Sequence, residues 1–135
     1  MLKILICCGG GFSSSAMVTK VKKEIVEKHL EDKVMIDFYP FTLANEIMSK
    51  YDVLMACPHL RYGVPQFIKK YEKECIPIYL LPPKMYGTMN LEDIMEDAED
   101  IIAGFKETKM NPFHFPNEDN VLKVRRIHSY RREHQ

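Results

Sequence analysis

The chain has 135 residues, of which 46% are hydrophobic and 28% are charged. This length suits about one folded domain, and the composition is that of a globular protein rather than a disordered or fibrous one. Lys plus Arg and Asp plus Glu each total 19, so no global field draws the protein to nucleic acid or to an anionic membrane surface. Any partner must therefore be recognised by a local surface.

The four cysteines are Cys7, Cys8, Cys57 and Cys75. Their spacing matches neither the disulfide framework of a small secreted domain nor the paired ligands of a zinc site. No apolar run approaches the roughly 18 residues of a membrane helix, and the first residues lack the pattern of a signal peptide. We therefore expect a cytoplasmic protein with reduced thiols, no metal and no other cofactor.

Short apolar runs alternate with helical patterns along the chain. Residues 2–7 are almost all apolar and end at glycines, which predicts a buried strand. Ser13 to Ser15 then offer N-caps to a helix of about four turns. Residues 34–39 alternate apolar and polar side chains and predict a second strand, and residues 42–48 predict a short helix.

The same alternation continues in the second half. Residues 51–58 predict a third strand closed by a proline, and a helix follows over 59–71, delayed by a glycine and a proline. Residues 75–83 predict the fourth strand. A last helix over 91–105 has apolar side chains at helical spacing, and we expect the six carboxylates between positions 92 and 100 to form its solvated face.

Strands that are nearly all apolar and alternate with helices favour parallel pairing with right-handed crossovers. The chain is therefore predicted to be an α/β protein with one small open sheet of four parallel strands and helices on both faces. Residues 1–106 form this domain, and residues 107–135 are a C-terminal extension of unknown role. From Lys123 onward the extension holds five basic residues and one acid, and we expect this tail to serve solubility.

The stretch CCGGGFSSS, residues 7–15, follows the first strand and precedes the first helix. In a parallel sheet this loop lies at the carboxyl edge, where ligands bind. Glycines let backbone N–H groups converge, serine hydroxyls add donors, and the positive end of the helix favours negative charge. These features lower a thiol's pKa and cradle a phosphoryl group on its sulfur, so the loop is predicted to bind an anion.

Either cysteine of this stretch is a candidate nucleophile. Cys7 ends the strand, where a side chain packs against a neighbour, whereas Cys8 opens the loop and can point into the ring of amides. We assign Cys8 as the nucleophile and keep Cys7 as the alternative. A buried pair of small residues beside a flexible turn is the structural alternative, since free cysteine is often simply buried.

The predicted site lacks two groups that hydrolysis requires. Phosphatases with a phosphotyrosine-phosphatase-like fold need an arginine six residues after the cysteine and an acid for the leaving oxygen. Ser14 stands at the first position, and the loop that we expect over residues 82–90, after the fourth strand, holds no carboxylate. The loop also lacks the ending of a nucleotide-binding P-loop. The site is therefore predicted to hold a phosphoryl group without giving it to water.

Three stretches, ILICCGGGFSSSAMV, YDVLMACPHLRY and IYLLPPKMYGTMN, resemble the enzyme IIB components of the lactose/cellobiose type in the bacterial phosphoenolpyruvate-dependent sugar phosphotransferase system. The resemblance covers about residues 1–106 and leaves the remaining tail unmatched. It implies that Cys8 takes a phosphoryl group from a phosphohistidine of the IIA partner and passes it to a sugar bound by the membrane-embedded IIC partner. The membrane is thus approached through IIC alone, and no nucleic acid is involved.

The resemblance also implies a phosphate loop made of Gly9, Gly10, Gly11, Phe12, Ser13, Ser14 and Ser15. The family commonly has Ser or Ala at the first two of these positions, and a single cysteine where this chain has two.

His59 and Tyr86 follow the third and fourth predicted strands and are candidates to lie beside the phosphate loop at the same edge. His59 would orient the loop or contact a partner, and Tyr86 would hydrogen-bond the phosphate. A surface histidine without a role and a tyrosine that packs over the sheet are the alternatives.

Three other functions are weighed. A redox pair of Cys7 and Cys8 would strain the peptide between neighbours and lacks the Cys-x-x-Cys spacing. A low-molecular-weight phosphatase or arsenate reductase would share the fold but fails on the missing arginine. A regulatory module that keeps the fold and has lost transfer stays open, as do the identity of the sugar and the oligomeric state.

Overall fold

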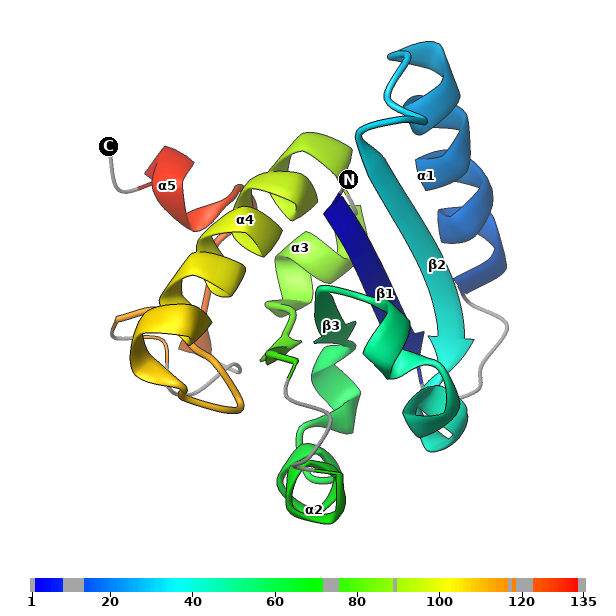
Figure 1. The fold of residues 1–135 in the computed structure, drawn as a ribbon. Coiled ribbons are helices and arrows are strands. Elements are labelled where there is room, and N and C mark those ends of the chain that lie inside the picture. The colour runs from blue at the N-terminus through cyan, green and yellow to red at the C-terminus, as the bar shows by residue number, and fades with distance from the viewer. Residues whose placement is uncertain are drawn as a thin grey trace.

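One sheet of four parallel strands organises the molecule, in the order β2-β1-β3-β4 (Figure 1). The computed structural model describes residues 2–8, 14–71, 76–88, 90–116, 118 and 123–133, with backbone alone at residues 8 and 14–18. The strands are β1 (Leu2–Cys8), β2 (Val34–Pro40), β3 (Val53–Ala56) and β4 (Ile78–Leu80). All pairs are parallel, which confirms the predicted α/β architecture.

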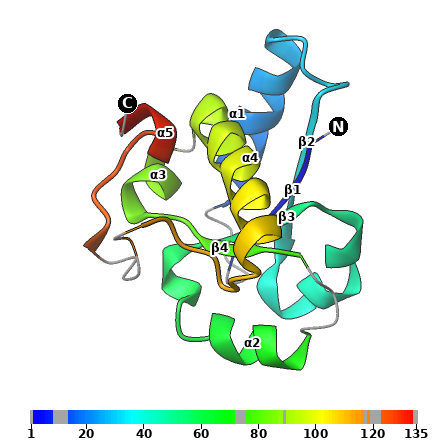
Figure 2. The same ribbon diagram turned by 60° about the vertical axis from the view of Figure 1, so that its left-hand side comes forward.

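Helices cover both faces of this sheet (Figures 1 and 2). One face carries α1 (Ser14–Glu27) and α4 (Leu91–Thr108), and the other carries α2 (Val64–Lys70) and the 3-10 helices η1 (Phe41–Glu46) and η2 (Met48–Lys50). Successive strand residues point to opposite faces, so two cores alternate along β1. Ile4 and Ile6 enter the first core, and Leu5 and Cys7 enter the second.

Two segments near the carboxyl edge differ from their predictions. The helix predicted over 59–71 is divided into η3 (Pro58–Leu60) and α2, because Gly63 and a proline in the first turn set the start of α2. The segment 82–90, predicted as a loop, contains the short helix α3 (Pro83–Thr88). A proline at the first helical position is pre-organised for a helix, and this signal was present in the sequence.

The acidic face of α4 is also different from its prediction. Asp93 and Asp97 are 2% and 0% exposed, so the prediction of a solvated face is wrong for these two carboxylates, whereas Glu92 and Glu99 are exposed as expected. The physical reason is that the described part of the C-terminal extension lies over this face. Backbone N–H groups of the extension donate to both carboxylates, from Ser129 to Asp93 at 2.9 Å and from Tyr130 to Asp97 at 2.8 Å.

The extension first runs along the outer edge of β4. Phe113 N donates to Ile78 O at 2.8 Å, and Ile78 N donates to the side-chain oxygen of Asn111 at 2.9 Å. Phe113 and Phe115 then enter the core on the α4 side of the sheet, 8% and 4% exposed. This segment therefore satisfies the edge of β4 and contributes to the core at the same time.

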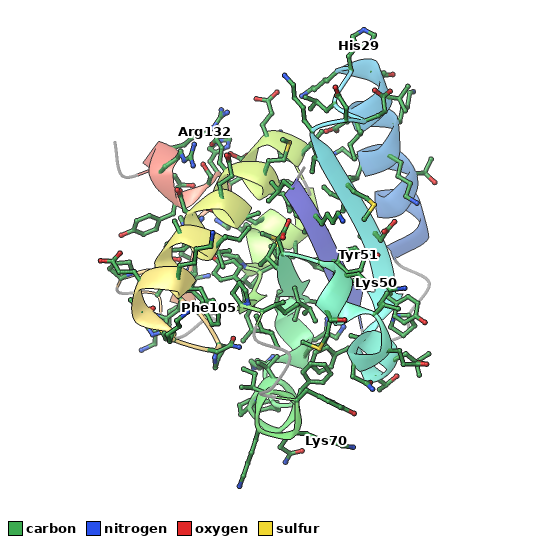
Figure 3. All side chains as sticks on the ribbon, viewed as in Figure 1. His29, Lys50, Tyr51, Lys70, Phe105 and Arg132 are labelled. Atoms are coloured by element: carbon green, nitrogen blue, oxygen red, sulfur yellow. The ribbon has the colours of Figure 1, made fainter. Side chains whose placement is uncertain are left out.

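The end of the extension, including α5 (Tyr130–Glu133), lies against α4 (Figure 2). Arg131 pairs with Asp100 at 2.9 Å and Arg132 with Glu96 at 2.7 Å, and Figure 3 shows Arg132 between the two helices. The expectation that this basic tail serves solubility is wrong for these residues, because they bind the acidic face of α4.

None of the helices in the described part of the chain has the length and apolar character that a membrane span requires.

Candidate functional site

The carboxyl ends of β1, β3 and β4 lie at one edge of the sheet. Cys7 is in register with Ala56 of β3, and Ala56 with Leu80 of β4, while Cys8 ends β1 opposite Pro40 of β2. The order of the strands reverses at β1, because the chain leaves it for β2 on one side and later returns to β3 on the other. Ligands of open α/β sheets bind at such a switch point.

Cys7 lies inside the core on the α2 side of the sheet. It is 0% exposed and packs among residues such as Leu5 and Ala44. Its carbonyl oxygen accepts the backbone N–H of Cys57 at 3.0 Å and the Cys57 thiol at 3.1 Å. Cys57 is also 0% exposed and lies in the core, whereas Cys75 lies outside the described residues.

Cys8 is described by its backbone, which closes β1 at the switch point. The predicted phosphate-loop residues Gly9 to Ser13 lie outside the described residues, as do the side chains of Cys8, Ser14 and Ser15. The backbone on both sides of the loop is described, and α1 begins at Ser14. The N-terminal end of α1, where the helix dipole is positive, thus follows the end of β1 after residues 9–13.

The structure brings the candidates His59 and Tyr86 together. His59 is exposed in η3, directly after β3, and Tyr86 is half-buried in α3, directly after β4. Their rings meet edge to face, with centroids 6.3 Å apart and planes at 66°. Tyr86 also packs against the core on the α4 side of the sheet, which limits the movement of its ring. The pair therefore forms a defined wall of the carboxyl edge.

A buried guanidinium, that of Arg126, lies between α4, β4 and the extension, and no motif in the sequence marked it as a candidate. Arg126 is 5% exposed and holds Glu118 with two hydrogen bonds of 2.7 and 2.8 Å. It also donates to Asp97 at 3.1 Å and to the hydroxyl of Tyr79 at 2.7 Å. No periodicity marked this residue, because it lies in an irregular segment where burial depends on tertiary contacts.

Burial dominates the ionisation of the groups around Arg126. It raises the pKa of Asp97 to about 6, against the opposing effect of the Arg126 charge and the Tyr130 N–H. It also raises the pKa of Tyr79 far above its usual range. Burial opposes the charge of Arg126, yet the Glu118 hydrogen bonds and the neighbouring acids keep its pKa above the ordinary value. The guanidinium is therefore a permanent cation in the interior.

No group of three or more metal-ligating side chains occurs among the residues that the structure describes. What these residues offer is a switch-point strand that ends on a cysteine, a helix N-terminus beyond the loop, and an aromatic wall. This arrangement suits the transient binding of a phosphoryl group.

Comparisons with known proteins agree with this geometry. A family model described as PTS system, lactose/cellobiose specific IIB subunit, matches residues 3–97. The solution structure of a cellobiose-specific phosphotransferase IIB component protein from Borrelia burgdorferi is similar, with a TM-score of 0.60 and 26% identity. That alignment covers 76% of this chain and 93% of the Borrelia chain.

The lactose-specific IIB component domain of the phosphoenolpyruvate:carbohydrate phosphotransferase system from Streptococcus pneumoniae shares the fold, with a TM-score of 0.50 and 16% identity. The alignment covers 81% of this chain and 98% of the pneumococcal domain. Residues 98–135 lie outside the family match, which ends within α4.

Proposed function

Because the chain belongs to the lactose/cellobiose-specific IIB subunit family of the sugar phosphotransferase system, we propose that Cys8 is its phosphoryl-carrying nucleophile. Membership makes the protein a phosphotransferase subunit and a component of sugar transport. In the proposed cycle, the phosphoryl group arrives from a phosphohistidine of a IIA protein and leaves to a sugar held by a IIC transporter. Such a carrier would work in the cytoplasm, where it meets both partners.

Each half of the cycle exchanges one bond for another. The Cys8 thiolate attacks the phosphorus atom of the phosphohistidine, so that a P–S bond forms while the P–N bond breaks and the imidazole leaves. A hydroxyl oxygen of the sugar then attacks the same phosphorus and loses its proton. The P–S bond breaks, the sugar phosphate forms and the thiolate returns. No water enters either half, which is consistent with Ser14 in place of a phosphatase arginine.

The observation that carries the proposal is the contrast between the two cysteines of β1. Cys7 has no exposed surface and lies in the second core, out of reach of a phosphoryl donor. Cys8 ends the strand at the switch point, just before the loop that leads to α1. We assign Gly9 to Ser15 to the phosphate loop, where amides and serine hydroxyls stabilise the phosphocysteine.

His59 and Tyr86 are proposed as the wall beside this loop. Their contact across η3 and α3 holds Tyr86 at the edge where the phosphoryl group would lie. In this role the Tyr86 hydroxyl donates a hydrogen bond to a phosphoryl oxygen, and His59 faces the incoming partner.

A reconstituted transfer assay tests this function. The purified chain is incubated with the general phosphocarrier proteins, a matching IIA protein and labelled phosphoenolpyruvate. We expect the chain to acquire label that is sensitive to acid and iodine, and to lose it when sugar and IIC-containing membranes are added. Absence of label with a competent IIA protein would favour a regulatory module instead. Rapid release of phosphate from an aryl phosphate would indicate a phosphatase.

A further inference from the structure

The C-terminal extension reaches α3 through one buried side chain. Nη1 of Arg126 lies 3.3 Å from the sulfur of Met85, which is 1% exposed in the middle of α3. The guanidinium itself is fixed by Glu118, Asp97 and Tyr79, which come from the extension, α4 and β4. A side chain held by this many partners cannot move without breaking several hydrogen bonds, so it is a rigid support for α3.

A second contact holds α3 at its C-terminal end. The ammonium group of Lys20 in α1 donates to the carbonyl oxygen of Thr88, the last residue of α3, at 2.6 Å. The short helix is thus held between α1, which follows the predicted phosphate loop, and the extension. Tyr86 follows Met85 directly and points its ring at His59. Any shift of Met85 therefore moves Tyr86 at the site.

We propose that Arg126 is a positioning residue for phosphoryl transfer, which holds α3 through Met85 so that Tyr86 meets the phosphoryl group on Cys8. The inference rests on the proposed function. Arg126 and Glu118 lie beyond residue 97, so this support comes from residues outside the family match. In this proposal the extension helps to position a side chain of the phosphoryl-transfer site.

The size of the expected effect follows from the geometry of transfer. A displacement of about 1 Å at a reacting group costs up to about 100-fold in rate. Arg126 has a planar fork of donors that matches Glu118 and Tyr79 together, and a lysine ammonium cannot reproduce it. We therefore expect Arg126→Met to lower the transfer rate about tenfold and Arg126→Lys to lower it less.

A double-mutant cycle in the full-length protein tests the proposal. Wild type, Arg126→Met, Tyr86→Ala and the double variant are compared in the labelling assay with phosphorylated IIA protein. If Arg126 acts through Tyr86, the double variant is no slower than the slower single variant, because both changes remove the same contact. The kcat should fall while the KM for the phosphorylated IIA protein stays constant, since the loss concerns the transferred group.

Folding is checked by circular dichroism, and Arg126→Lys replaces Arg126→Met in the cycle if the latter does not fold. Arg131→Gln is the matched control, because Arg131 lies in the same extension and its hydrogen bonds and ion pairs go to α4, to Glu96, Glu99 and Asp100. It should transfer at the wild-type rate. An unchanged rate in Tyr86→Ala, or rate losses that multiply in the double variant, would overturn the proposal. An unlabelled wild type would instead refute the proposed function.

Discussion

The two buried sides of α4 are held by different chemistry. Toward the sheet, α4 buries apolar side chains that are at most 1% exposed: Leu91, Ile94, Ala98 and Ile101. Toward the extension it buries the carboxylates Asp93 and Asp97, which accept backbone N–H groups and the Arg126 guanidinium. The apolar side is stabilised by removal from water alone, whereas the acidic side needs every partner in place.

This difference teaches where the molecule tolerates change. Apolar packing accepts substitutions of similar volume, because its contacts have no direction. A buried carboxylate that loses its partner keeps the full cost of burial. The seam between α4 and the extension contains both kinds of contact, and four substitutions of graded effect separate its apolar from its charged part.

The largest effect is expected for Phe115→Ala. Phe115 is 4% exposed and stacks on Tyr130 with ring centroids 4.5 Å apart. Loss of this ring should lower the free energy of unfolding by about 3–5 kcal/mol, as for other buried phenylalanines. Urea unfolding followed by circular dichroism measures it. Phe105→Ala on half-buried Phe105 is the control, and an equal loss there would mean that the extension adds no core of its own.

Gly104→Ala is expected to have the next largest effect. A Cβ atom at this position would lie 2.6 Å from two carbon atoms of the Phe113 ring, which the bridge to Tyr79 holds against β4. Overpacking of about 1–3 kcal/mol should exceed the gain of about 1 kcal/mol in helix propensity. Thermal melts of both variants measure this difference, with Gly87→Ala as the control. A Cβ atom at position 87 would meet nothing within 4 Å, so Gly87→Ala should be neutral or stabilising. Stabilisation by Gly104→Ala would contradict the close packing of Phe113.

Glu96→Gln tests the charged part of the seam through pH. The hydrogen bonds from Arg132, together with one from Ser129, lower the pKa of Glu96 to about 2 from 4.5. Since the folded pKa is the lower one, this stabilisation is present above pH 4.5 and is lost as the pH falls toward 2.

Glu96→Gln should lower the free energy of unfolding by about 1 kcal/mol at neutral pH, as is typical of partly exposed ion pairs. The difference from wild type should shrink as urea unfolding is repeated at decreasing pH below 4.5. A difference that stays constant down to the acid limit would show that packing, and not charge, accounts for the loss.

The smallest effect is expected for Arg131→Gln. Arg131 is 41% exposed and pairs with Asp100, which is 33% exposed, at 2.9 Å. Exposed pairs contribute about 0–1 kcal/mol and are screened by salt. The loss should therefore stay below about 1 kcal/mol and disappear in high salt. A larger loss that persists in high salt would show that this exposed pair stabilises the fold as strongly as the buried contacts of Arg126 do.

The sheet and the first core were predictable because their signals are local. Each strand is an apolar run that ends at glycine or proline, and the apolar positions of α4 recur at helical spacing. The same rules failed on the acidic face of α4. A row of carboxylates has one appearance in sequence whether water or an arginine covers it, and Arg126 lies 29 residues after Asp97.

The carboxyl edge shows the same division. The ends of β1 and β3, and the placement of His59 and Tyr86 at the same edge, follow from strand order, whereas the contact between their rings was not predicted. The helix α3 was missed, although its first residue is a proline, because two successive prolines and a glycine in this segment are typical of a loop. The support by Arg126 depends on tertiary contacts that no spacing encodes. The assignment of Cys8 and its loop stays a prediction that chemistry must test.

The most direct test locates the phosphoryl group. The chain and its Cys7→Ser and Cys8→Ser variants are phosphorylated by a competent IIA protein, digested under mild conditions and mapped by tandem mass spectrometry. We expect phosphocysteine at position 8 in wild type and in Cys7→Ser, and none in Cys8→Ser. Phosphorylation of Cys7, or of Cys8→Ser at an unchanged level, would contradict the assignment of Cys8 as the carrier.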